Sequence, residues 1–212
     1  PINIDGDTSS RDANSNYLNN NSVYAYGERN GYGIYITGTA HDTIINNSYI
    51  EVLGSTTNNF GVYSASYTAN TTIYNSVINA SNNYDVRGWN HDGASWIKLV
   101  NCTWNESDGA ANDSDFEIFN YNYLTINVTH NNNALINANV TARDDKDNLE
   151  FSELSSTSGV VWYKEMLEFK QNTSGYYYEG NYSVNTTKQG YSSSNESVNM
   201  SANKQLDISL TD

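Results

Sequence analysis

The chain has one cysteine, one proline, few basic residues and no long apolar run. Cys102 has no second cysteine to pair with, and a single thiol cannot build a cysteine-based zinc site. Ten Lys and Arg against 24 Asp and Glu give a net charge of −14, which argues against nucleic acid or an anionic membrane as a partner. A membrane span needs about 18 consecutive apolar residues, and the sequence has no such run. It begins at Pro1 without a signal-like apolar segment, so we expect a mature product or a fragment.

Small polar and aromatic residues are abundant instead. The chain has 35 Asn and 43 Ser or Thr among 212 residues, whereas charged residues make up only 16%. This is not the charge-rich composition of a disordered chain. Eighteen Tyr, four Trp and five Phe add apolar area, and the sequence therefore predicts a folded protein with an aromatic-rich interior.

Many of the asparagines lie in Asn-x-Ser/Thr triplets, which are acceptors for N-linked glycans. Chance placement would give about 7 such triplets, and the chain has fourteen. Asn-rich turns contain single triplets by chance, so the prediction of glycosylation depends on the twofold excess over the whole chain. It predicts an extracellular, cell-surface glycoprotein, and the scarcity of cysteine favours an archaeal cell over a eukaryotic one. The acceptors are Asn20, Asn46, Asn70, Asn79, Asn101, Asn105, Asn112, Asn127, Asn139, Asn172, Asn181, Asn185, Asn195 and Asn199.

The first half contains an internal repeat. A short phrase, usually Asn-Ser followed by apolar residues, recurs after 26, 28 and 26 residues, and each copy from the second on follows a β-prone stretch. A second phrase, Gly33-Ile34-Tyr35, returns 28 residues later as Gly61-Val62-Tyr63, and Val86-Arg87-Gly88 lies near the next expected place. The first phrase occurs at Asn21-Ser22-Val23-Tyr24, Asn47-Ser48-Tyr49-Ile50, Asn75-Ser76-Val77-Ile78 and Asn101-Cys102-Thr103-Trp104.

These phrases resemble the repeats of right-handed parallel β-helices, the pectate-lyase-like solenoids. The resemblance implies a coil of about four rungs over residues 1–114. Stacked rungs lie about 4.8 Å apart, so we expect a structural ladder of Asn21, Asn47, Asn75 and Asn101, with Ile44, Ile73 and Leu99 in one inward column. The alternative is that abundant Asn creates a false register, in which case an antiparallel sandwich replaces the coil.

From about Asp115 the repeat stops and apolar residues alternate with polar ones, as in strands with one wet face. The intervening Asn131-Asn132-Asn133, 144–148 and 192–195 are turn compositions. This spacing predicts an immunoglobulin-like β-sandwich over residues 115–212, with 163–169 as a helical turn or a loop. The alternating faces are Leu124, Ile126 and Val128; Ala138, Val140 and Ala142; Tyr182, Val184 and Thr186; and Leu206, Ile208 and Leu210.

The second half also resembles carboxypeptidase-regulatory-like and immunoglobulin-like surface modules, as found in archaeal cell-surface glycoproteins. The resemblance depends on residues 134–141 followed by Asp144, on Ser158-Gly159-Val160, and on Tyr182-Ser183-Val184 leading to Gly190-Tyr191. The family usually has Pro where Leu135 stands. It implies a spacer or adhesive unit without chemistry of its own.

A search for catalytic groups finds one local cluster, formed by Asp85, Arg87, His91 and Asp92. It contains an acid, a cation and a titratable base, the groups that polysaccharide-cleaving enzymes use. Loops rich in Asp and His are usually solvated turns, and the neighbouring rungs add only His41, Asp42 and Tyr63, so we predict no catalytic residues and no enzyme. His130 lies beyond the coil.

Binding groups are equally sparse. Asp5-Gly6-Asp7 and the Asp144, Asp145, Asp147 group could hold Ca²⁺, but neither has the later bidentate acid of an EF-hand, and we predict no cofactor and no metal site. Tyr176-Tyr177-Tyr178 could stack on sugars, although an alternating strand would divide these rings between core and surface. Cys102 takes the place of Ser22, Ser48 and Ser76 in the repeat, which predicts a packed residue rather than a reactive thiol.

We therefore expect an all-β structural glycoprotein, a subunit of a cell-surface filament, sheath or surface layer, with copies of itself and covalent N-glycans as partners. Residues 105–115 are too short and polar to cover the end of the coil, so we expect a neighbour to cover it, for instance through residues 1–10. The alternatives are a polysaccharide-processing or sugar-binding β-helix fragment and an adhesin module that does not polymerise.

Overall fold

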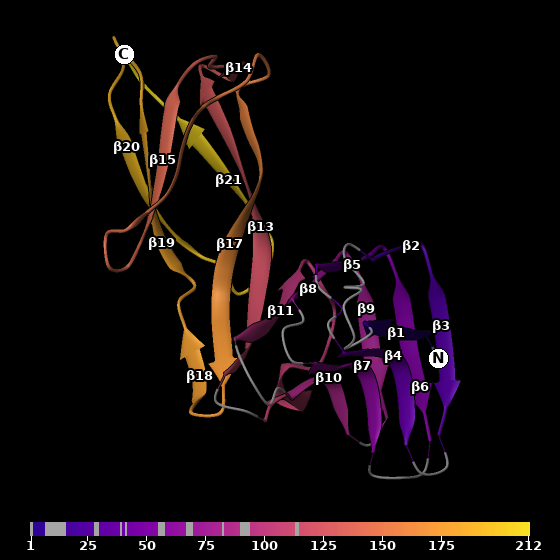
Figure 1. The fold of residues 1–212 in the computed structure, drawn as a ribbon. Coiled ribbons are helices and arrows are strands. Elements are labelled where there is room, and N and C mark those ends of the chain that lie inside the picture. The colour runs from indigo at the N-terminus through magenta and orange to yellow at the C-terminus, as the bar shows by residue number, and fades with distance from the viewer. Residues whose placement is uncertain are drawn as a thin grey trace. The chain divides into compact units, whose positions relative to one another are not determined.

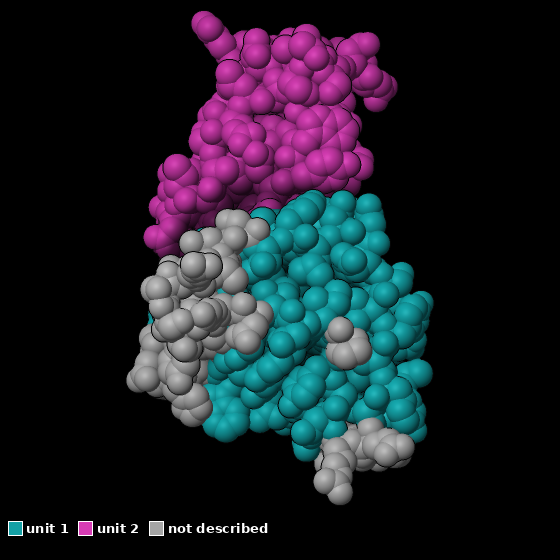
Figure 2. Space-filling view, turned by 45° about the vertical axis from the view of Figure 1, so that its right-hand side comes forward, with its two compact units in different colours: residues 1–120, 170–177 teal, residues 121–169, 178–212 magenta. Residues whose placement is uncertain are grey.

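The computed structural model describes residues 2–6, 16–27, 30–38, 40, 42–54, 58–66, 70–81, 83–89, 94–112 and 115–212. These residues form strands almost throughout, with one short 3₁₀ turn, η1 (Glu106–Asp108), so the predicted all-β class is confirmed. Within these ranges no helix is long and apolar enough to span a membrane. The chain divides into two compact units, shown in separate colours in Figure 2.

The first unit, residues 1–120 and 170–177, is a coil of parallel strands. Successive strands join a first, a second and a third sheet in turn and then return to the first (Figure 1). Because each strand pairs in parallel with the strand one turn later, the three sheets grow together along the coil. The first sheet contains β1 (Ile2–Gly6), β4 (Gly31–Gly38), β7 (Asn59–Ser66), β10 (Tyr84–Trp89) and β12 (Gly109–Ala111). The second contains β2 (Tyr17–Asn19), β5 (Thr43–Asn46), β8 (Asn70–Tyr74), β11 (Ser95–Val100) and the start of β13 (Phe116–His130). The third contains β3 (Ser22–Tyr26), β6 (Tyr49–Leu53) and β9 (Val77–Ala80).

Equivalent apolar residues stack inside this coil. In the second sheet Ile45 pairs with Ile73 and Ile73 with Leu99, and all three are fully buried. The prediction of Ile44 in this column is wrong, because its neighbour Ile45 takes the inward position and Ile44 remains 36% exposed. In the first sheet the predicted repeat is confirmed, since Ile34 pairs with Val62 and Val62 with Val86.

The later end of the coil is covered by this chain itself. Phe116, at the start of β13, is fully buried, and a Cβ added to Gly88 would lie 1.8 Å from its ring. The indole Nε1 of Trp104 donates to Asn120 Oδ1 at 3.2 Å, and Gln171 Nε2 donates to the carbonyl of Gly109 at 3.0 Å. The expectation that only a neighbouring subunit could cover the end near Trp104 is therefore wrong. The segments that cover it lie beyond the polar stretch 105–115 in the sequence.

The second unit, residues 121–169 and 178–212, encloses a separate core between strands of two sheets. Four antiparallel strands form one sheet in the order β16-β15-β19-β20. The rest of β13 pairs with β14, with β21 and with β17, and the β13–β21 pair is parallel, unlike the wholly antiparallel arrangement predicted. The strands are β14 (Asn133–Ala134), β15 (Asn139–Asp144), β16 (Leu149–Leu154), β17 (Val160–Asn172), β18 (Gly175–Tyr178), β19 (Asn181–Thr187), β20 (Ser194–Asn199) and β21 (Lys204–Ser209).

Most of the predicted inward faces of this unit are confirmed. Leu124, Ile126 and Val128 are fully buried, as are the alternating residues of β15 and β19, while Leu206 is half-buried. Residues 163–169, for which a helical turn or a loop was expected, belong to β17. The predicted domain boundary between residues 114 and 115 moves to the middle of β13, after Asn120, and residues 170–177 return to the first unit.

Candidate functional sites

One corner of the coil repeats an asparagine in a strained backbone conformation. Asn20, Asn47, Asn75 and Asn101 all have positive φ, between 47° and 56°. Asparagine tolerates this left-handed region better than most residues, which explains its recurrence at a corner that every turn must make. The strand register aligns Asn20, not the predicted Asn21, with Asn47, so Asn20 is the corner residue of the first turn.

Side-chain hydrogen bonds follow this corner along the coil. Asn101 Nδ2 donates to Asn75 Oδ1 at 2.7 Å, Asn75 Nδ2 to Asn46 Oδ1 at 3.4 Å, and Asn46 Nδ2 to Asn19 Oδ1 at 3.3 Å. The ladder therefore includes the predicted Asn75 and Asn101 but passes through Asn46 and Asn19 in the earlier turns. Asn21 occupies the next column, where its backbone N–H donates to Ser48 Oγ.

The fourteen glycan acceptors all lie within the described ranges and outside both hydrophobic cores. Nine are exposed and five are half-buried. The two buried asparagines of the described ranges, Asn59 and Asn120, are not in acceptor triplets. Every acceptor residue is thus at least partly exposed to solvent, and an attached glycan requires such access.

The predicted acid and base cluster is only partly described, since His91, Asp92 and His41 lie outside the described residues. Asp85 is buried, and its two carboxylate oxygens accept the backbone N–H groups of Ala80 at 2.6 Å and Asn105 at 2.7 Å. Burial raises the pKa of this carboxyl, while the two backbone hydrogen bonds oppose the rise. Both oxygens are used to fix turns, so Asp85 is a structural residue in this arrangement.

Arg87 lies on an aromatic stack on the outer side of the first sheet. Its guanidinium carbon is 5.0 Å from the ring centre of Phe60, 5.7 Å from that of Tyr63 and 5.4 Å from that of Tyr84. Tyr63 stacks on Tyr35 with only 9° between the ring planes. Rings stacked along the coil cover one another's faces, so they stabilise the turns and leave little face for a sugar. Burial raises the pKa of Tyr63.

The acidic turn of the second unit binds its own backbone. Asp144 Oδ1 accepts the N–H groups of Lys146 at 2.9 Å and Asn148 at 2.7 Å, and Oδ2 accepts the amide of Asn148 at 2.8 Å. These bonds lower the pKa of Asp144. In the part of the chain that the structure describes, no three His, Cys, Asp or Glu side chains meet as a metal site. Asp7 is not among the described residues.

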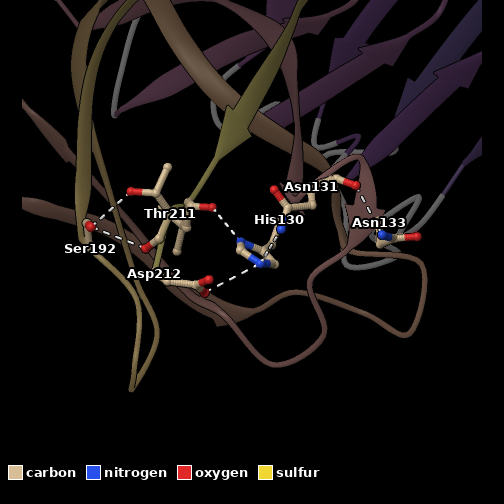
Figure 3. Close-up of polar contacts among 7 residues, drawn as sticks. His130, Asn131, Asn133, Ser192, Thr211 and Asp212 are labelled. Atoms are coloured by element: carbon tan, nitrogen blue, oxygen red, sulfur yellow. Dashed lines mark hydrogen bonds and ion pairs between the residues drawn. The ribbon is translucent and has the colours of Figure 1, made fainter.

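His130, Ser192 and Asp212 have the composition of a catalytic triad, and His130 Nε2 lies 3.4 Å from Asp212 Oδ1, but the serine is not connected to the histidine (Figure 3). Ser192 Oγ bonds to Thr211, at 3.2 Å to the carbonyl and 3.0 Å to Oγ1, rather than to the histidine. His130 Nδ1 faces the carbonyl of Leu210 at 3.0 Å and therefore carries the proton. Its Nε2 faces the Asn131 amide at 2.8 Å and the Asp212 carboxylate, so both ring nitrogens are engaged by groups other than Ser192, and the serine has no base beside it.

Cys102 is bonded in the same way as the serines at the equivalent place in earlier turns. Cys102 Sγ bonds to the carbonyl of Val100 at 3.5 Å, as the hydroxyls of Ser48 and Ser76 bond two residues back, and burial raises its pKa to about 11. The predicted packed thiol fits this geometry, although it is Asn21 rather than Ser22 that shares its column.

Tyr176, Tyr177 and Tyr178 are all exposed, so the expectation that these rings divide between core and surface is wrong.

The sequence reasoning missed an aromatic pair in β17. Trp162 and Tyr163 are adjacent in a strand, yet both are exposed, because Tyr163 has a φ of +46° and interrupts the alternation of faces. A regular strand would bury one of the two, so only the unusual pairing of two large aromatics in the sequence could have indicated the site.

Comparisons with known proteins identify no relative, since no family model, no curated protein and no solved structure matches the chain.

Proposed function

We propose that this chain is an extracellular structural glycoprotein, a subunit of an archaeal cell-surface filament, sheath or surface layer. Its parts would be a parallel β-helix and an immunoglobulin-like module, and its partners would be covalent N-glycans and copies of itself. The observation that carries the proposal is the placement of the acceptors. All fourteen lie at or near the surface, in both units, although they are spread over a chain in which other asparagines are buried.

Glycans on these sites would cover the surface of a strand-rich protein. Its edge strands could otherwise pair with strands of other chains. Edge strand β20 carries two acceptors, Asn195 and Asn199, so glycans there would block lateral association. The opposite edge strand, β16, has no acceptor, and it exposes 56% of Leu149 and 60% of Leu154. An exposed edge strand that carries large apolar side chains can pair with a strand of another chain. We therefore assign β16 as the assembly edge.

Electron microscopy of native cell-surface material, labelled with antibodies against this chain, tests the assembly. Label along filaments or sheets supports the proposal, and label on dispersed particles contradicts it. Leu154→Lys should shorten the polymers measured by sedimentation, because a charge on an edge strand opposes edge pairing. Thr157→Lys, on the exposed turn between β16 and β17, adds the same charge away from the edge and should leave polymer length unchanged.

A further inference from the structure

Tyr163 holds an unfavourable backbone conformation that places two aromatic rings on the surface of the second unit. A positive φ is rare for a bulky residue in a strand. In β17, Val161 and Met166 are both buried although they are five positions apart, an odd spacing that would place them on opposite faces of a regular strand. Trp162 and Tyr163 between them are 52% and 64% exposed. Backbone strain together with two exposed aromatic rings is unfavourable for an isolated subunit, and such strain concentrates at binding sites.

The rings belong to a patch on the outer face of the sheet. Tyr163 lies 5.6 Å from Trp162 and 5.7 Å from Tyr123 of β13, measured between ring centres. Tyr123 points outward because its neighbour Leu124 is buried in the core. The ring planes of the two pairs are tilted by 37° and 65°, so these rings do not stack in parallel as Tyr35 and Tyr63 do in the coil. We call Tyr123, Trp162 and Tyr163 the aromatic patch.

A glycan acceptor lies on the same face of the same strand. Asn127 follows Tyr123 by four residues, so the alternation of strand side chains places both on the outer face, about 13 Å apart. Asn127 pairs with Asp207 of β21, and its Nδ2 donates to Asp207 Oδ1 at 3.2 Å. The amide has a second N–H, and this is the position that a glycan would occupy while the bond to Asp207 is kept.

We propose that the aromatic patch is the docking platform for the N-linked glycan of Asn127, an inference that depends on the proposed glycosylation. Pyranose sugars have apolar C–H faces, and the exposed rings of Trp162 and Tyr163, with their polar edges, suit them. A glycan of a few rings attached to Asn127 reaches the patch without leaving the sheet face. The covalent attachment keeps its local concentration high, so even weak stacking is populated. The stacked sugar compensates for the exposure that the conformation of Tyr163 creates.

The chain provides a matched control acceptor. Asn139-Val140-Thr141 repeats the triplet Asn127-Val128-Thr129 and also lies in a strand. The cross-strand neighbours of Asn139 are Leu154 and Thr187, and neither is aromatic. A glycan on Asn139 therefore shares the attachment chemistry and the strand context but has no ring among its paired neighbours.

A double-mutant cycle on the glycosylated protein tests the docking. The acceptor variants are Asn127→Gln and Asn139→Gln, and the ring variants are Trp162→Leu and Tyr163→Asn, the latter because asparagine keeps the left-handed conformation without the ring. Removing the Asn127 glycan should raise the unfolding equilibrium constant by about threefold to tenfold, and this effect should vanish when either ring is already replaced. The same ring variants in unglycosylated protein should leave that constant unchanged or lower it.

Glycopeptide mass spectrometry of the same samples separates the outcomes. A glycan on Asn127 whose effect is independent of the rings, or equals that of Asn139, overturns the docking and leaves the glycoprotein proposal intact. The docking is also overturned, and the glycoprotein proposal kept, when other acceptors are modified but Asn127 is bare. It is likewise overturned when the ring variants change the sedimentation of glycosylated and unglycosylated protein equally, which would indicate a patch that docks protein. Fourteen unmodified acceptors overturn both proposals.

Discussion

Asn101 donates a hydrogen bond from its side-chain amide to the side-chain oxygen of Asn75, one turn earlier in the coil, at 2.7 Å. Both residues have positive φ, so each combines a strained backbone with a side chain that bonds along the coil. The same residue type thus satisfies a conformational demand and a hydrogen-bonding demand at every turn.

Replacement of Asn75 separates these two contributions. Asn75→Ala should destabilise the chain by about 2 kcal/mol, because alanine is disfavoured at positive φ by about 1–2 kcal/mol and the side-chain bonds are lost. Asn75→Gly loses the same bonds but accepts the conformation, and it should cost about 1 kcal/mol. Urea unfolding of both variants measures the difference. Equal losses would show that the left-handed corner is not what asparagine stabilises. Asn75 is not in an acceptor triplet, but its partners Asn46 and Asn101 are, so the comparison uses unglycosylated protein.

The one-residue errors at this corner show what the repeat phrases could and could not determine. Asn19, Asn20 and Asn21 are consecutive, so matching the phrase cannot decide which of them turns the corner. The backbone pairing of Asn19 with Asn46 decides it. Ile44 and Ile45 present the same ambiguity, because two adjacent isoleucines fit an inward position equally well until the register is known. The phrases Gly33-Ile34-Tyr35 and Gly61-Val62-Tyr63 contain one β-branched residue each, and there the prediction was correct.

Contacts between segments that lie far apart in the sequence could not be predicted from it. Phe116 and Gln171 close the coil from beyond the repeats, and no local pattern connects them to Gly88 or Gly109. Among the candidate site residues, Asp85 was selected for its charge, but its role depends on the two N–H groups that the fold brings to it. Exposure of the acceptors, in contrast, follows from composition, since asparagine is mostly a surface residue.

Asp85 provides a test of its structural role. Asp85→Asn keeps the shape of the side chain but can accept only one of the two N–H groups, because its amide nitrogen is a donor. It should cost about 1–3 kcal/mol in urea unfolding, the cost of an unsatisfied buried donor. Asp42→Asn, at an exposed position of the same unit, is the control and should be close to neutral. A neutral Asp85→Asn would contradict the role assigned to its carboxylate.

Cys102 predicts a pH dependence. The residue as a whole is half-buried, but its thiol packs against the core, and burial raises its pKa from 9.0 to about 11. Between these values the unfolded chain ionises its thiol while the folded chain does not. Stability that is fully present below pH 9 is therefore lost as the pH rises towards 11, by about 1–3 kcal/mol.

Cys102→Ser should remove this loss, because a serine hydroxyl does not titrate there and can still bond to Val100. Unfolding of both proteins at pH 8, 9, 10 and 11 measures the difference, in which the tyrosines cancel. Parallel stability curves for the two proteins would mean that the folded thiol ionises as freely as an exposed one.

The proposed function depends on glycans attached to this chain, and glycopeptide mass spectrometry of the native protein tests it most directly. Digestion of the purified material yields peptides that contain the fourteen acceptor asparagines. We predict that peptides from both units, including those with Asn79 of the first unit and Asn195 of the second, carry masses of attached sugars, because these residues are exposed. Recovery of all fourteen asparagines without added mass would contradict the proposal that this chain is a structural glycoprotein.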